Sequence, residues 1–146
     1  NLIRGAYHFY RPDEDPIKQA NSFIKSARLE SGDLPPVLDI EKLPRKKSKK
    51  QLVEDLKVWL KIMEETFGAK PIIYTYYHYY KDNLEGEFDD YTLWLANYND
   101  VPSPSPNNDW SFWQFTEQGI AYGVNVKIDL NVYNGNIWTL QQLILD

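Results

Sequence analysis

Two carboxylates stand two positions apart in the apolar segment 36–41, at Asp39 and Glu41. Residues i and i+2 of a strand point to the same face, so both carboxyl groups share one face while Leu38 and Ile40 take the other. Such a pair in a partly apolar site suits glycoside cleavage, because one carboxyl must donate a proton to the leaving oxygen while the other stays ionised. Their proximity raises one pKa and allows this division of labour. In the alternative interpretation, the two side chains only cap the next segment or pair with lysines.

The position of the pair in its strand also favours a functional site. A buried parallel strand is normally apolar on both faces, and carboxylates at its end break that pattern. The C-terminal ends of strands are where barrel and α/β enzymes place their active sites. Other predicted strands carry further candidates, which we expect to converge with the pair if the strands are neighbours: Tyr74, Tyr98, Gln114, Asp129 and Asn131.

Apolar periodicity predicts the elements that must position these residues. Strands are expected at 5–10, 36–41, 71–76, 91–98, 111–116 and 127–132. Helices are expected from the Asp15–Pro16 cap to Gly32, from a Ser48/Gln51 capping box to Gly68, at 79–84 and at 137–145. The resulting order is β-α-β-α-β-α-β-β-β-α, in which the first half alternates as in a parallel sheet or barrel and the later strands lack helices.

Composition narrows the function classes. The chain has 146 residues, 42% apolar and 25% charged, which fits one globular domain spanning residues 1–146. It contains no cysteine and two histidines, so we expect no metal site and no cofactor. A net charge of −5 argues against nucleic acid as a partner. No apolar run predicts a membrane span, and no signal peptide is recognisable at the start.

Six short segments, in order, carry a resemblance to a known family. They are Gly-Ala-Tyr-His-Phe at 5–9, Leu-Asp-Ile-Glu at 38–41, Pro-Ile-Ile-Tyr-Thr at 71–75, Leu-Trp-Leu-Ala-Asn-Tyr at 93–98, Trp-Gln-Phe at 113–115 and Ile-Asp-Leu-Asn at 128–131. Together the six resemble glycoside hydrolase family 25. These are lysozymes that hydrolyse the β-1,4 bond between N-acetylmuramic acid and N-acetylglucosamine. The resemblance implies an irregular TIM-like (β/α)5(β)3 barrel and peptidoglycan as the partner. It therefore also implies an extracellular or cell-envelope location.

The resemblance also implies roles for individual residues. Glu41 is similar to the family's acid/base, and Asp39 to the residue that orients the 2-acetamido group or stabilises the transition state. Asp129 matches a further acidic residue of the site. Tyr74, Tyr98 and Gln114 fall on positions that line the groove. Whether the reaction is substrate-assisted is left open by these residues.

The chain departs from the family pattern at its start. Family members begin with a strand that carries an active-site Asp, followed by a second strand, and neither is found before residue 5. We therefore expect a catalytic-domain fragment that lacks the first two barrel strands and exposes two sheet edges through which chains can associate. Two alternative functions stay open: a non-catalytic glycan- or cell-wall-binding domain on the same scaffold, and a hydrolase of chitin-like polymers. The longer acidic signature of chitinases, Asp-x-x-Asp-x-Asp-x-Glu, is absent before Glu41.

Overall fold

The computed structural model describes residues 2–146 as six strands and four helices in the predicted order. The strands are β1 (Tyr7–Phe9), β2 (Val37–Asp39), β3 (Ile72–Tyr76), β4 (Thr92–Ala96), β5 (Phe112–Gly119) and β6 (Ile128–Tyr133). The helices are α1 (Pro16–Ala27), α2 (Lys49–Phe67), α3 (Tyr77–Asn83) and α4 (Ile137–Gln141). None of the helices found in residues 2–146 is long and apolar enough to cross a membrane.

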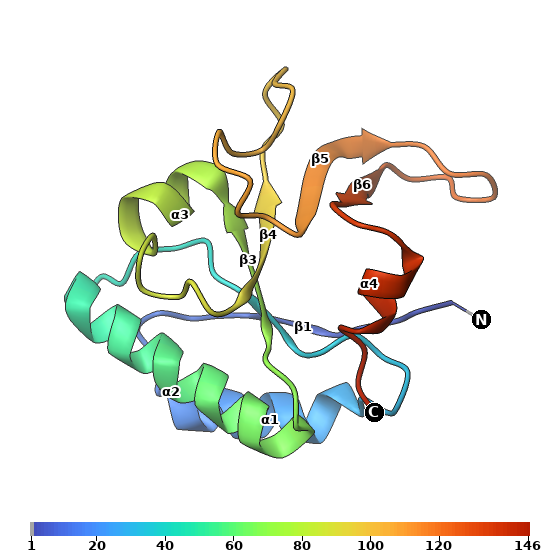
Figure 1. Cartoon of the computed structure of the whole chain (residues 1–146). Helices are drawn as coiled ribbons and strands as arrows, with labels where there is room; N and C mark the ends of the chain where they lie inside the picture. The colour runs from blue at the N-terminus through green and yellow to red at the C-terminus, as the bar shows by residue number, and fades with distance from the viewer. Residues whose placement is uncertain (1) are drawn as a thin grey trace.

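The strands form one sheet in the order β1-β2-β3-β4-β5-β6. The first five are parallel and β6 runs antiparallel to β5. The sheet curls into an open half-barrel, with α1 and α2 side by side below it and α3 beyond the end of β3 (Figure 1). Because the first five strands are parallel, their C-terminal ends meet at one rim of the sheet, where the predicted site residues stand.

The helix ends follow local hydrogen-bonding chemistry, and α1 and α2 each differ from the expectation in one respect. Asp15 caps α1 by accepting from the amides of residues 17 and 18, as predicted. The helix ends at Ala27, earlier than predicted, because Arg28 already adopts a left-handed conformation with φ 48°. Gly32, φ 90°, serves a later turn. Ser48 caps α2 through the Gln51 amide, but the Gln51 side chain donates to Asp55, so the reciprocal half of the predicted capping box is replaced by a side-chain contact.

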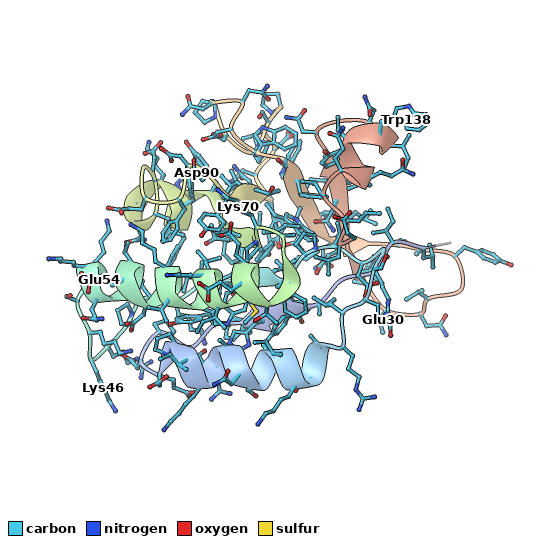
Figure 2. The ribbon with its side chains drawn as sticks, turned by 60° about the horizontal axis from the view of Figure 1, so that its bottom comes forward. Glu30, Lys46, Glu54, Lys70, Asp90 and Trp138 are labelled. Atoms are coloured by element: carbon cyan, nitrogen blue, oxygen red, sulfur yellow. The ribbon has the colours of Figure 1, made fainter. Side chains whose placement is uncertain are left out.

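The main hydrophobic core lies between the outer face of the sheet and the helices. Trp59, Leu60 and Met63 of α2 are fully buried in it, together with Leu38 of β2 and Ile40, which follows that strand. Glu54 of α2 projects away from this core on the solvent side (Figure 2), whereas Asp55 of the same helix is buried and paired with Lys47 at 2.6 Å. Packing Leu38 and Ile40 outward leaves Asp39 and Glu41 to face the concave side of the sheet.

A second, smaller cluster closes one end of the concave face. Val37, Ile72 and Phe112 are buried there against residues of α4 and the tail that follows it. The tail is tied back to the loop before β2, because Leu145 and the 32–33 segment exchange two backbone hydrogen bonds of 2.8 and 2.9 Å. The concave face is therefore packed with side chains at one end and open at the other, where the strands end.

Candidate active site

A groove of about 690 Å³ opens on the concave face of the sheet. All seven residues singled out from the sequence lie along it: Asp39, Glu41, Tyr74, Tyr98, Gln114, Asp129 and Asn131. They come from β2 through β6 or from the residues directly after these strands. The curled parallel sheet thus brings together side chains that are up to 92 positions apart in the sequence, from Asp39 to Asn131.

The segment that carries the carboxylate pair is held on both sides by hydrogen bonds. β2 ends at Asp39, so Glu41 lies beyond the strand that was predicted to contain it. The backbone nevertheless continues in register, because Tyr10 donates its amide to the Asp39 carbonyl at 2.8 Å and Ile40 donates to the Tyr74 carbonyl at 3.0 Å. The fully buried Thr75 hydroxyl donates to the Ile40 carbonyl at 2.5 Å. These bonds fix the backbone on either side of the pair and so fix the direction of both carboxyl groups.

The two carboxyl groups sit in different environments. Asp39 is 6% exposed, and its Oδ1 atom has no hydrogen-bond partner within residues 2–146. Glu41, which lines the same groove, is only half-buried. Burial, the charge of Glu41 and a hydrogen bond with Glu41 raise the pKa of Asp39 to about 8. In the neutral range the pair therefore holds one proton between two carboxyl groups, which is the division that acid-base chemistry requires.

Gln114 organises the wall of the groove opposite this pair. Its side-chain oxygen accepts hydrogen bonds from the hydroxyl of Tyr74, at 2.5 Å, and from the hydroxyl of Tyr98. Gln114 is 6% exposed, and these contacts satisfy the buried amide oxygen as the sequence required. Burial raises the pKa of Tyr98 to about 12, and burial with the neighbouring Tyr98 raises that of Tyr74 further. Both phenols are thus neutral hydrogen-bond donors at physiological pH.

Strands β4 and β6 complete the wall. The indole Nε1 of Trp94 donates to the side-chain oxygen of Asn131 at 2.9 Å, which fixes that amide beside the exposed Asp129. Tyr74 and Trp94 pack edge to face with ring centroids 5.8 Å apart, and Tyr76 packs edge to face against Tyr98 at 6.0 Å. The result is an aromatic surface with a few oriented polar groups, as in many glycan sites.

The groove lining also includes Tyr76 and Glu117, which were not among the seven site residues expected from the sequence. Tyr76 stands at the end of β3, and Glu117 lies on a stretch of β5 that extends past its predicted end at Thr116. Strict alternation would place Gln114 and Glu117 on opposite faces, but β5 has an irregular register against β6 on both sides of Thr116. This irregularity turns the Glu117 side chain towards the groove. No signal in a single sequence marks such a bulge.

His8 of β1 faces the helices. Its Nε2 lies 3.0 Å from the side-chain oxygen of Gln19, and its ring stacks on Trp59 with centroids 5.7 Å apart. It is therefore a hydrogen-bonded histidine of the core side, away from the groove. Among residues 2–146, no group of three or more His, Cys, Asp or Glu side chains is arranged to hold a metal ion.

The order of motifs around the groove is matched by a family model. The model for glycosyl hydrolases family 25 matches residues 1–124. The chain belongs to this family. The match includes the carboxylate pair, the tyrosines, Gln114 and Glu117, while Asp129 and Asn131 lie beyond it.

Individual relatives and solved structures are similar to this chain as well. The chain is 39% identical over 146 residues to the "Uncharacterized protein YegX" of Escherichia coli (strain K12), covering 98% of this chain and 52% of that protein. It is 30% identical over 151 residues to "Lysozyme M1" of Streptomyces globisporus, covering 92% of this chain and 51% of that one. The structure of a family 25 glycosyl hydrolase from Bacillus anthracis superposes with a TM-score of 0.87 at 29% identity, over 99% of this chain and 70% of that chain. The chain thus spans about half the length of these two curated relatives.

Proposed function

We propose that this groove is the site of a peptidoglycan hydrolase that cleaves the β-1,4 bond between N-acetylmuramic acid and N-acetylglucosamine. The observation that carries the proposal is the Asp39–Glu41 pair, which holds one proton in the neutral range at the open end of a glycan-sized groove. Membership of glycosyl hydrolases family 25 and the likeness to a protein named as a lysozyme support the reaction class. Such a substrate places the action of the protein at the cell envelope or outside the cell.

In this proposal Glu41 is the acid/base and Asp39 its partner. Glu41 is the more accessible of the two carboxyl groups and so can reach the glycosidic oxygen. Asp39 lies behind it, buried, and holds the proton of the free pair by hydrogen bonding. A glycosidic oxygen that accepts a hydrogen bond from Glu41 draws the shared proton to Glu41, and the Asp39 carboxylate then stabilises positive charge on the sugar.

The polar groups around the carboxyl pair also fit a sugar substrate. The Tyr74 and Tyr98 hydroxyls, both anchored on Gln114, and the amide of Asn131 surround the pair with oriented polar groups. Asp129 supplies a further carboxylate from β6. We propose that these five residues bind the substrate rather than react with it.

We further propose that the six strands correspond to the last six of an irregular (β/α)5(β)3 barrel. The parallel β1 to β5 with helices between the early strands, and the helix-free run from β4 to β6, support this assignment. β1 and β6 are the outer strands of the sheet in residues 2–146.

The test measures reducing ends released from purified peptidoglycan, followed by borohydride reduction and analysis of the reduced sugar. Reduced N-acetylmuramic acid at the new chain ends supports the proposed bond, and reduced N-acetylglucosamine contradicts it. Glu41→Gln is expected to abolish release while circular dichroism stays unchanged, and the exposed Glu54→Gln is the matched control. Binding to insoluble peptidoglycan without any release by the wild-type chain would instead support a non-catalytic glycan-binding domain.

A further inference from the structure

The charges along the groove are all of one sign. Four carboxyl groups line it, on Asp39, Glu41, Glu117 and Asp129, of which the first two share one proton in the neutral range, and its lining contains no lysine, arginine or histidine. The ammonium group of Lys42 lies 5.4 Å from the centroid of the Phe9 ring, which borders the groove, but Lys42 itself is not part of the lining. The proposed hydrolysis uses two of these carboxyl groups, Asp39 and Glu41, and does not by itself explain why Glu117 and Asp129 also line the groove.

Glu117, like Asp129, makes no side-chain hydrogen bond or ion pair within residues 2–146. Glu117 is exposed to solvent. It nevertheless faces the groove because of the irregular register of β5. An exposed glutamate that helps neither the fold nor a neighbouring charge is available to a bound ligand.

Glu117 shares its part of the groove with Tyr76 and with the catalytic pair. Tyr76 lines the groove with 37% of its surface exposed. The negative charges of Glu41, Glu117 and Asp39 all add to the effect of burial in raising the pKa of its hydroxyl. A second sign is Asp39, a 94%-buried residue of the same lining, whose Oδ1 atom has no hydrogen-bond partner in the described chain. A cation placed here would meet the Glu117 carboxylate and the aromatic side chain of Tyr76, two kinds of group that attract cations.

The sugars of a cell-wall glycan differ in whether they carry a positive charge. An N-acetylated sugar presents a neutral amide at C2, whereas a de-N-acetylated sugar presents an ammonium group. Free carboxylates in a groove cannot donate hydrogen bonds to the amide oxygen, but they pair with the ammonium. We infer that the groove prefers glycans carrying free amino groups, and that Glu117 together with Tyr76 binds the ammonium of a de-N-acetylated sugar next to the cleavage point. This inference rests on the proposed function, because it takes the groove to be a glycan site.

Binding is measured by calorimetry with two matched probes, the β-1,4-linked tetramers of glucosamine and of N-acetylglucosamine. At pH about 5.5 the amines are protonated. We expect the glucosamine tetramer to bind about fivefold more tightly, the strength of one exposed ion pair. Glu117→Gln should remove most of this preference. Glu54→Gln, which removes the same charge from the outer face of α2 (Figure 2), should leave it intact. Raising the salt from about 0.05 to about 0.5 M should weaken the preference by screening.

The outcomes separate the inference from the proposed function. Equal affinity for the two tetramers, or binding of neither, overturns the inference even if peptidoglycan is hydrolysed. An equal loss of preference in Glu54→Gln and Glu117→Gln also overturns it, because net charge alone would then explain the selectivity. A preserved glucosamine preference without release of reducing ends contradicts the proposed hydrolysis and leaves the inference standing.

Discussion

Asp39→Asn is expected to stabilise the folded protein at neutral pH while damaging its chemistry. Asp39 is 6% exposed and its pKa is raised to about 8, whereas in the unfolded chain it titrates near 3.8. At pH 7 folding therefore has to protonate a group that is ionised in the unfolded chain. Asparagine is neutral in both states, and its amide can donate to Glu41 in place of the protonated carboxyl, so the substitution removes this cost.

The size of the effect follows from the two pKa values. A tenfold difference in proton affinity is worth about 1.4 kcal/mol, so the cost at pH 7 reaches about 4 kcal/mol. The sign follows from the raised pKa: the native state binds more protons, so the wild-type loses stability as pH rises from about 4 to about 8. We therefore expect the free energies of unfolding of Asp39→Asn and wild type to be nearly equal at pH about 3. They should diverge by about 1.4 kcal/mol per pH unit above the unfolded pKa.

The assay is urea unfolding followed by tryptophan fluorescence at several pH values between about 3 and 8. Asp33→Asn serves as a control of opposite sign, because the hydrogen bond from Arg4 lowers the pKa of that carboxyl. Its stabilising contribution is present above the unfolded pKa and is lost as pH falls through the lower folded pKa. Asp33→Asn should therefore destabilise the protein at pH 7 and have less effect in acid. A stability gain in Asp39→Asn that is independent of pH would refute the reasoning, since cavity or packing effects do not titrate.

Three further predictions concern the site and its supports. Hydrolysis should decline as pH rises through about 8, because the carboxyl pair then loses its shared proton; a rate profile that stays flat to pH about 10 contradicts this. Thr75→Val should cost about 1 to 2 kcal/mol in urea unfolding by leaving the buried Ile40 carbonyl without its donor, and should lower kcat more than it raises KM. Thr75→Ser, which keeps the donor, should restore most of kcat. Gln114→Leu should lower the free energy of unfolding by about 2 to 3 kcal/mol, because the hydroxyls of two tyrosines lose their common acceptor. Tyr98→Phe removes only one of those donors and should cost less. Equal losses in the two variants would argue against the shared acceptor.

Much of the fold could be predicted because its signals are local. The order of strands and helices, the Asp15 cap of α1 and the Gly68 end of α2 all follow from spacing and capping chemistry within a few residues. The end of α1 was placed too late, since Gly32 was taken as the stop although Arg28 had already left the helix. A left-handed arginine is uncommon enough that no sequence rule selects it over a nearby glycine.

The sequence by itself determined which residues carry the chemistry and which face they share, because side chains alternate between faces wherever the backbone is extended. Asp39 and Glu41 on one face, and the candidates on the later strands, needed no tertiary knowledge. Only the tertiary structure decided their environments. Burial raised the pKa of Asp39, the shared acceptor Gln114 tied two tyrosines together, and a register irregularity turned Glu117 into the groove. Each of these depends on contacts between strands distant in the chain, and such contacts exist only once the sheet has curled.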